Sequence, residues 1–406
     1  MYHHRLIEEK LTNLAAYSKI VLVLGARQVG KSTLLKHLFP DVKHILFDPV
    51  QDFYNVRQDP DLFLNHFSAP IILDEIQFVP QLLPALKRRV DLSSQMGQYY
   101  LTGSQNLSMM RQVSESLAGR VAILHVGPMT TSEIENQASN WLSHYLAEPR
   151  SVLNMSAVTN KNLFTALWRG GLPGILNTPN ELIPNYFSSY VQTYLERDVR
   201  LIDNIKDLYT FDRFIGIASV LTAQEINYSQ LGRELGLTST LAKNWLDLLL
   251  YSYQWDEVQP YHGNSIKRLS KRPKGYITDS GLACYLQRIS SPEALARHPT
   301  LGAIFETFVV NNIKRMADAL PIAPQFYHWR TNGGAEVDLI MEIDGMFYPI
   351  EIKCKTTITK HDARGIHAFR ETFPQLRIQP GLIIYAGTEC YPVTENVMAF
   401  PWYVSV

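Results

Sequence analysis

In the first third of the chain, short apolar runs alternate with segments in which apolar residues recur at helical spacing. Short apolar runs predict β-strands at residues 20–24, 44–47, 71–73, 98–101 and 121–126. Most of these runs are apolar throughout, which is typical of a parallel sheet that is covered on both faces. Segments with helical periodicity lie between them, including 32–38 and 81–91. The alternation predicts a wound α/β domain, which we assign to residues 1–150.

The pattern becomes mainly helical in residues 151–295, which we assign to a second domain. Within it, a short helix at 228–235 and a second helix at 240–251 enclose a tight turn. Two extended segments around a basic loop follow, between residues 258 and 277. Helix, turn, helix and hairpin is the order of a winged helix-turn-helix, and we predict that motif here.

Residues 296–406 have the pattern of a small mixed α/β domain. An amphipathic helix is predicted at 301–316 and a second helix at 359–373. The predicted strands are 326–330, 335–343, 347–353 and 382–385.

Composition narrows the class of protein. Hydrophobic residues make up 46% of the 406 positions and charged residues 19%, which favours buried cores over disorder. The 38 basic and 38 acidic side chains cancel, so any attraction to nucleic acid requires a local basic patch. Three cysteines are too few for a disulfide framework or a zinc site. With neither a signal-peptide pattern nor an apolar run of membrane-spanning length, we expect a cytoplasmic protein.

Residues 25–32 fit the phosphate-loop pattern G-x-x-x-x-G-K-[ST] at every position, between a predicted strand and a predicted helix. Backbone N–H groups of such a loop wrap the phosphates of a nucleotide. Lys31 is expected to reach the β- and γ-phosphates and the Ser32 hydroxyl to hold Mg²⁺. We therefore predict ATP and Mg²⁺ as ligands. The predicted binding residues are Gly25, Ala26, Arg27, Gln28, Val29, Gly30, Lys31, Ser32 and Thr33.

Polar residues at the ends of later strands complete this predicted site. Asp74 is expected to take part in the coordination shell of Mg²⁺, and Glu75 is expected to activate the attacking water. The alternative is that the two carboxylates only cap the next helix. Thr102 or Ser104 is a candidate γ-phosphate sensor, with a plain turn as the alternative. Arg120 is either an ordinary surface arginine or a group that stabilises the transferring phosphate of its own or a neighbouring subunit.

In this order the motifs resemble a family of prokaryotic AAA+-type ATPases in which a P-loop domain is joined to a C-terminal domain of unknown function. The resemblance extends over 169–173, 190–199, 276–282, 301–309, 334–338 and 351–353, which is essentially the whole chain. It implies a P-loop NTPase sheet and ATP hydrolysis. It also implies assembly into homo-oligomers, because ATPases of this type often act as rings or dimers that share an arginine.

Charged residues of the last block form a second candidate site. A hairpin would bring Asp338 near Glu351 and Lys353, and Glu306 can approach from the preceding helix. Oxygen ligands from Glu306, Asp338 and Glu351 suit Mg²⁺ or Mn²⁺, and Lys353 can activate water. The set resembles the PD-(D/E)xK nuclease core, which implies a restriction-endonuclease-like domain. The alternatives are an inactive fold of that kind and a charged cross-strand pair.

The loop 266–274 contains five positive charges and no acid, so it is the candidate contact with a DNA backbone. The alternatives are a solvated loop and a contact with protein. His3 and His4 are expected to lie in a disordered terminus rather than in a metal site.

These observations leave three hypotheses. The first is a P-loop ATPase whose nucleotide state is coupled to a DNA-binding C-terminal half. The second is an ATP-dependent regulator or signalling switch that binds protein partners through an inactive nuclease-like fold. The third is an ATP-gated, metal-dependent DNA endonuclease.

Overall fold

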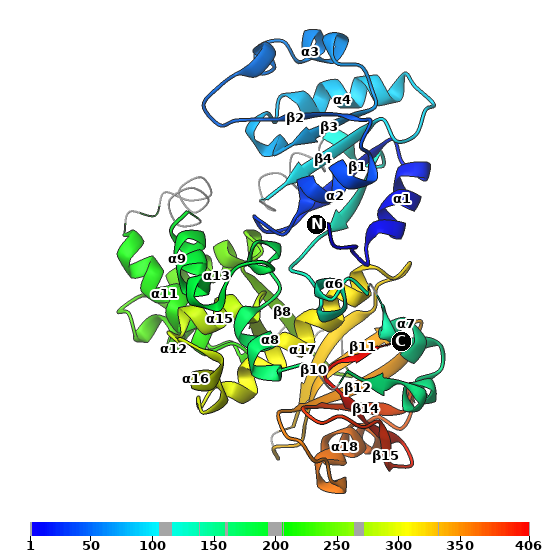
Figure 1. The fold of residues 1–406 in the computed structure, drawn as a ribbon, viewed down its shortest axis with the longest axis vertical. Helices are drawn as coiled ribbons and strands as arrows, with labels where there is room; N and C mark the ends of the chain where they lie inside the picture. Colours follow the sequence, from blue (N-terminus) through cyan, green and yellow to red (C-terminus); the bar gives the residue numbers. More distant parts are fainter. Residues whose placement is uncertain are drawn as a thin grey trace. The chain divides into compact units, whose positions relative to one another are not determined.

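The computed structural model describes residues 2–104, 116–137, 139–158, 161–193, 205, 207–263, 272–331 and 333–405. The chain forms two compact units, whose elements are labelled in Figure 1. The first contains residues 1–127 and 248–254, and the second contains 128–247 and 255–406. The predicted helical and C-terminal blocks thus fall mainly in one unit, and the division into three domains at 150 and 295 remains a prediction.

The first unit contains the parallel sheet that the apolar runs predicted (Figure 1, blue and cyan). Its strand order is β2-β3-β4-β1-β5, and every neighbouring pair is parallel. The central strands β1, β3 and β4 are buried at every position, which explains why their sequences are almost entirely apolar. The strands are β1 (Ile20–Leu24), β2 (Lys43–Leu46), β3 (Ile71–Asp74), β4 (Tyr99–Gly103) and β5 (Val121–His125).

Helices of this unit pack their apolar faces on the sheet. In α4, Leu82, Leu86 and Val90 recur at helical spacing and are buried in the core that also contains β1 and β3. Asp59 caps α3 by accepting a hydrogen bond from the backbone N–H of Leu62. The helices are α1 (Glu8–Tyr17), α2 (Lys31–Leu38), α3 (Pro60–His66) and α4 (Leu82–Asp91), with short 3₁₀ turns η1 (Phe53–Asn55) and η2 (Ile76–Phe78).

The N-terminal part of the second unit is helical. Its α-helices are α6 (Thr131–Ile134), α7 (Trp141–Ala147), α8 (Leu163–Arg169), α9 (Ile183–Thr193), α11 (Leu208–Val220), α12 (Tyr228–Arg233), α13 (Ser239–Tyr251, whose residues from 248 on belong to the first unit), α15 (Ser280–Leu286) and α16 (Pro292–Ala296). The predicted sequence of short helix, turn and second helix is present as α12 and α13. The antiparallel pair β8 (Trp255–Pro260) and β9 (Lys274–Ile277) follows it. The basic residues 264–271 between these strands lie outside the described residues.

A ten-stranded mixed sheet continues from this hairpin through the C-terminal part of the unit, in the order β15-β16-β14-β12-β11-β10-β8-β9-β7 with β13 beside β12. The connection is a short parallel pairing of β8 with β10, in which Gln259 lies opposite Tyr327. The sequence did not predict it, because parallel pairing between distant strands leaves no local pattern. The remaining strands are β7 (Gln224–Glu225), β10 (Gln325–Arg330), β11 (Glu336–Ile343), β12 (Met346–Lys353), β13 (Arg377–Ile378), β14 (Gly381–Tyr385), β15 (Tyr391–Thr394) and β16 (Val397–Pro401).

Two helices accompany this sheet, α17 (Leu301–Asp318) and α18 (Arg364–Thr372), and both were predicted within a few residues. A separate small pair joins β6 (Ser156–Ala157) to β17 (Val404–Ser405). None of the helices in the described ranges has the length and apolarity needed to cross a membrane.

Candidate functional site

The phosphate loop has a backbone conformation that requires its glycines. Gly25 has φ +153°, and a Cβ atom there would lie 1.9 Å from the carbonyl oxygen of Val126. Gly30, at φ 92°, is the N-cap of α2. Arg5 supports the loop by donating to the carbonyl oxygens of Val29 (2.9 Å) and Gly127 (2.8 Å). The loop lies between β1 and α2, as predicted, whereas no sequence motif pointed to Arg5.

Lys31 is buried in the first turn of α2 and folds back over the loop. Its ammonium group donates to the carbonyl oxygens of Gly25 at 2.9 Å and Ala26 at 2.8 Å. A buried ammonium beside the N-terminus of a helix provides positive electrostatic potential at the loop. The residues present therefore fit an anionic phosphate group.

Asp74 ends β3 and is almost fully buried. Burial alone would raise the pKa of its carboxyl group, but hydrogen bonds from His44, Thr102 and Ser32 outweigh burial and lower that pKa. His44 Nε2 lies 2.9 Å from Asp74 Oδ2, and the Thr102 hydroxyl donates to Oδ1. The structure thus brings together Ser32 and Asp74, the two predicted Mg²⁺ ligands, as oxygen donors suited to that ion.

Glu75 follows Asp74 in a left-handed conformation, with φ 58°. Its backbone N–H donates to the Thr102 hydroxyl at 2.9 Å, and its carboxylate accepts from the Ser104 hydroxyl at 3.0 Å. Gln77 donates to Ser104 at 3.1 Å and also contacts the Glu75 carboxylate. The two candidate γ-phosphate sensors, Thr102 and Ser104, are therefore hydrogen-bonded to the acidic residues. The sequence did not predict Gln77, because it lies beyond the motif that ends at Glu75.

Arg120 lies far from the phosphate loop of its own chain. It precedes β5, whose Val121 is opposite Ile20 at the amino end of β1, whereas the loop follows the carboxyl end at Leu24. The guanidinium pairs with Asp91 through Nε (2.5 Å) and Nη2 (3.0 Å). The alternative in which Arg120 acts on its own subunit's phosphate does not fit this position, and a role at a neighbouring subunit remains a prediction.

The second candidate site is built on β11, β12 and α17. The backbone N–H of Ile352 donates to Asp338 Oδ2 at 2.9 Å, which joins the two strands near the acids. Lys353 Nζ lies 2.9 Å from Glu351 Oε2 and 3.6 Å from Asp338 Oδ2. The predicted proximity of Asp338, Glu351 and Lys353 is present, and Glu306 approaches from α17.

Lys274 of β9 also enters this cluster, which the sequence did not predict. Its ammonium group lies 2.5 Å from Glu306 Oε1 and 3.3 Å from Asp338 Oδ1. The Tyr276 hydroxyl, on the same strand, donates to Glu306 at 2.9 Å. The sequence predicts Lys274 as part of the basic loop 266–274. That placement is wrong for this residue, because pairing of β8 with β10 carries β9 to the carboxylates.

The buried charges of the cluster shift one another's protonation. Burial, together with the negative charge of Asp338, raises the pKa of Glu306 to about 7. The same two causes hold the pKa of Glu351 well above its usual range, despite Lys353. Burial would also raise the pKa of Asp338, but Lys274 and Lys353 outweigh it and lower that pKa. Among the three carboxyl groups, Asp338 is therefore the one whose ionised form the two lysines favour most.

A cavity of about 300 Å³ adjoins the cluster. Lys274, Glu306 and Asp338 line one part of it, and His328 and Arg330 of β10 also line it. Its walls thus combine oxygen ligands for a cation with basic groups for an anion, a combination suited to a metal-bound phosphate group.

Comparison with known families matches three segments of the chain. Residues 17–135 match an AAA domain. Residues 160–293 match a domain of unknown function, DUF8612, and residues 301–404 match another, DUF4143. The AAA match covers the five-stranded sheet and the two acidic residues at the end of β3, Asp74 and Glu75.

Two mycobacterial proteins are similar over nearly the whole chain. An uncharacterized protein of Mycobacterium tuberculosis is 30% identical over 385 residues, covering 94% of this chain and 80% of that protein. An uncharacterized protein of Mycobacterium bovis gives the same values.

Solved structures with a similar arrangement include a Walker-type ATPase of Pyrococcus abyssi, at 18% identity and a TM-score of 0.43 over 71% of this chain and 96% of that chain. Another is the Holliday junction branch migration motor RuvB of Thermotoga maritima, at 18% identity and a TM-score of 0.31 over 65% and 94%.

Proposed function

This chain belongs to the same family as the two mycobacterial proteins, and we propose that its AAA-matching part, residues 17–135, binds ATP with Mg²⁺ and hydrolyses it. The observation that carries the proposal is one hydrogen-bonded network at the carboxyl ends of β3 and β4. It connects Ser32, Asp74, Thr102, Glu75 and Ser104.

Each residue has a distinct role in this proposal. The N–H groups of residues 25–30 and Lys31 hold the phosphates, and Ser32 and Asp74 hold the metal ion. Bound Mg²⁺ would neutralise charge that develops on the phosphate oxygens. Glu75 accepts a proton from the attacking water, while Ser104 and Gln77 fix the orientation of its carboxylate.

Glu75→Gln tests the proposed general base. We expect kcat for phosphate release to fall by about 100-fold or more, because the amide cannot accept the proton, while ATP affinity stays close to wild type. Steady-state hydrolysis and binding of a fluorescent ATP analogue measure the two quantities. Glu9→Gln, at an exposed position of α1, is the matched control. Undiminished hydrolysis by Glu75→Gln would refute this role.

We further propose that nucleotide state is coupled to DNA binding by the second unit. The order of α12, α13, β8 and β9 supports a winged helix-turn-helix, and Lys243 on α13 is exposed, although it pairs with Asp247 at 2.7 Å. A homo-oligomer that places Arg120 beside a neighbour's nucleotide belongs to the same proposal. A gel-shift assay with and without ATP tests the coupling, and equal DNA affinity in both states would contradict it.

Metal-dependent cleavage of nucleic acid is a second candidate function. It is favoured by the buried Asp338 and Glu351 and the half-buried Glu306 beside a polar cavity. These oxygen donors suit Mg²⁺ or Mn²⁺, and Lys353 is close enough to Glu351 and Asp338 to act on the same phosphate. Plasmid cleavage with Mn²⁺, lost in Asp338→Asn, would support it. If no cutting occurs, the regulator with an inactive nuclease-like fold is favoured.

Lys274 is expected to compete with a divalent cation in this second site. Its ammonium lies between Glu306 and Asp338, so Lys274→Met should strengthen Mn²⁺ binding by at least about tenfold. Because the Glu306 carboxyl group must lose its proton to bind a metal ion, the affinity for Mn²⁺ should also increase as the pH is raised from below to above about 7. Electron paramagnetic resonance titration of Mn²⁺ measures both. Lys355→Met, which removes a more exposed lysine paired with Asp362, is the control, and no gain in Lys274→Met would exclude the competition.

A further inference from the structure

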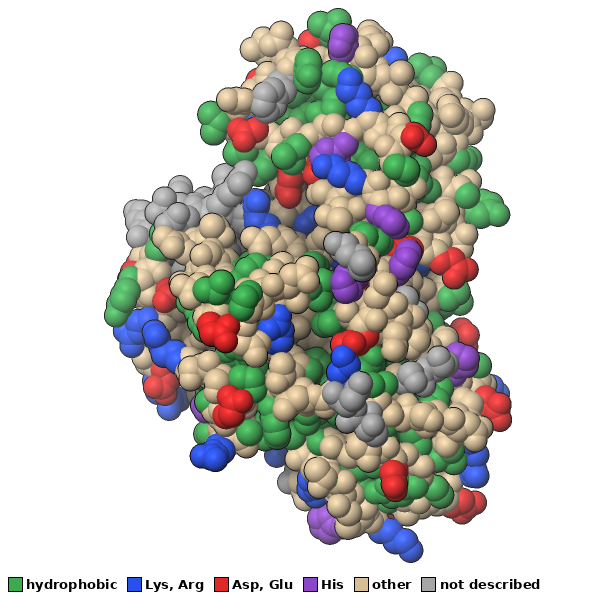
Figure 2. Space-filling model, in the orientation of Figure 1, with side chains coloured by type: hydrophobic (Ala, Val, Ile, Leu, Met, Phe, Trp, Pro, Cys, Tyr) green, Lys and Arg blue, Asp and Glu red, His purple; other side chains and the backbone are tan. Residues whose placement is uncertain are grey.

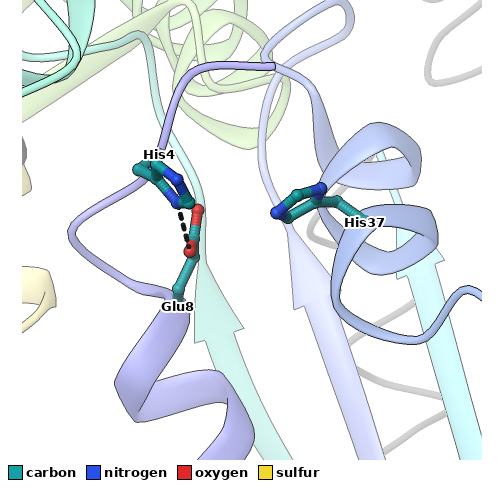
Figure 3. Close-up of side chains that lie close together, drawn as sticks. All are labelled: His4, Glu8 and His37. Atoms are coloured by element: carbon teal, nitrogen blue, oxygen red, sulfur yellow. Dashed lines mark hydrogen bonds and ion pairs between the residues drawn. The ribbon is translucent and has the colours of Figure 1, made fainter.

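Two histidines and a glutamate meet at the surface of the first unit. His4 precedes α1, Glu8 is in its first turn, and His37 is in the last turn of α2. One ligand atom from each lies within 4.8 Å of the others. Figure 3 shows the His37 ring pointing toward Glu8 and His4. The expectation that His4 belongs to a disordered terminus is therefore wrong.

The separation between His4 and Glu8 fits two ligands of one metal ion. His4 Nδ1 and Glu8 Oε2 are 3.2 Å apart, close to the roughly 3.4 Å between two ligand atoms of a tetrahedral zinc ion. The His4 and His37 rings are nearly perpendicular, at 76°, with centroids 5.8 Å apart. The ligand atom of His37 lies within 4.8 Å of those of His4 and Glu8.

Neighbouring groups already hold the carboxylate in place. Glu8 Oε1 accepts from the backbone N–H of Arg5 (2.6 Å) and from the Tyr2 hydroxyl (2.7 Å), which leaves Oε2 toward His4. The Tyr2 ring stacks on His37 with centroids 3.7 Å apart. Hydrogen-bonded and packed neighbours of this kind orient the ligands of metal sites. Burial would raise the pKa of Glu8, but these hydrogen bonds outweigh it and lower that pKa.

We propose that His4, Glu8 and His37 bind one Zn²⁺ ion, with water in the fourth position. Two imidazole nitrogens and one carboxylate oxygen form a set of ligands that binds Zn²⁺ in preference to Mg²⁺. His4 is 57% exposed, so the ion has a route from solvent. Histidine side chains (purple) reach the surface on the face in Figure 2.

The bound ion would connect the N-terminal segment, through His4 and Glu8, to the last turn of α2, through His37. Arg5, next to His4 in sequence, donates to the carbonyl oxygens of Val29 and Gly127 beside the phosphate loop. A metal that fixes His4 therefore also fixes the residue that supports the loop. Zinc should stabilise the first unit, because it binds the folded arrangement of two segments that separate on unfolding.

Calorimetric titration of metal-free, full-length protein with ZnCl₂ tests this site, with excess Mg²⁺ present to occupy the oxygen-rich sites. We expect one strong equivalent per chain, weakened about tenfold or more in His37→Ala and in Glu8→Gln. His3→Ala is the matched control and should bind like wild type. Zinc should also raise the melting temperature of wild type but not of His37→Ala.

Two results would overturn the proposal. One is the absence of a strong equivalent in wild type. The other is undiminished binding in His37→Ala together with loss in His3→Ala, which would mean that the adjacent histidines near the terminus bind the ion by themselves. Since neither measurement involves ATP, both are independent of the proposed ATPase function.

Discussion

Lys31→Ala is expected to weaken ATP binding by about 100-fold, equivalent to about 3 kcal/mol. The ammonium group is the charged donor of the phosphate loop, and charge-assisted hydrogen bonds contribute about 1.5–3 kcal/mol each. Its present partners, the carbonyl oxygens of Gly25 and Ala26, show that it already lies inside the loop. Equilibrium binding of a fluorescent ATP analogue measures the change.

Lys36→Ala is the control for this prediction, because Lys36 is an exposed lysine on the same helix. It should leave ATP affinity within about twofold of wild type. Circular dichroism spectra of both variants establish that each is folded. A folded Lys31→Ala variant that binds ATP as tightly as wild type would exclude residues 25–32 as the nucleotide site.

Asp279→Ala is expected to destabilise the second unit by about 2–4 kcal/mol. The Asp279 carboxylate is buried and accepts from the backbone N–H groups of Leu282 at 2.8 Å and Gly171 at 2.7 Å. It thus caps α15 and joins that helix to the loop after α8. Alanine would leave both donors buried without partners, at about 1–3 kcal/mol each. The midpoint of urea unfolding, followed by circular dichroism, measures the loss.

Asp207→Ala is the matched control, since Asp207 also caps a helix but is exposed, and its hydrogen bonds within the described part of the chain stay in its own turn, to Thr210 and Tyr209. Its loss should be clearly smaller than that of Asp279→Ala. Asp279→Asn keeps one acceptor oxygen and should lie between alanine and wild type. If the alanine variants at 279 and 207 lose equal stability, the link between α15 and the loop does not contribute.

The Asp279 contact also explains two segments that had no chemical interpretation in the sequence, 169–173 and 276–282. A Cβ atom on Gly170 would lie 2.2 Å from Asp279 Oδ1, and one on Gly281 would lie 2.4 Å from the carbonyl oxygen of Arg169. Both glycines are needed because the two segments pack backbone against backbone. Their role in the structure is to hold α8 and α15 together.

The sequence by itself determined the features that depend on short stretches of chain. The five parallel strands follow from local apolar runs, and the phosphate loop follows from eight consecutive residues whose glycines permit its turns. The order of α12, α13 and the β8–β9 hairpin was also predicted, because turn residues and helical periodicity are local signals. Asp338, Glu351 and Lys353 were placed together because a short hairpin fixes which residues share a face.

Only the tertiary structure decided the contacts between distant segments. Lys274 reaches Glu306 and Asp338 because β8 pairs with β10, and sequence periodicity contains no information on which strands become neighbours. Arg5 donates to the carbonyl oxygens of Val29 and Gly127, and His37 lies near Glu8. These contacts also join segments that are distant in sequence, so no local pattern predicts them. Side chains can be assigned to a face from local pattern, but their partners depend on how the whole chain packs.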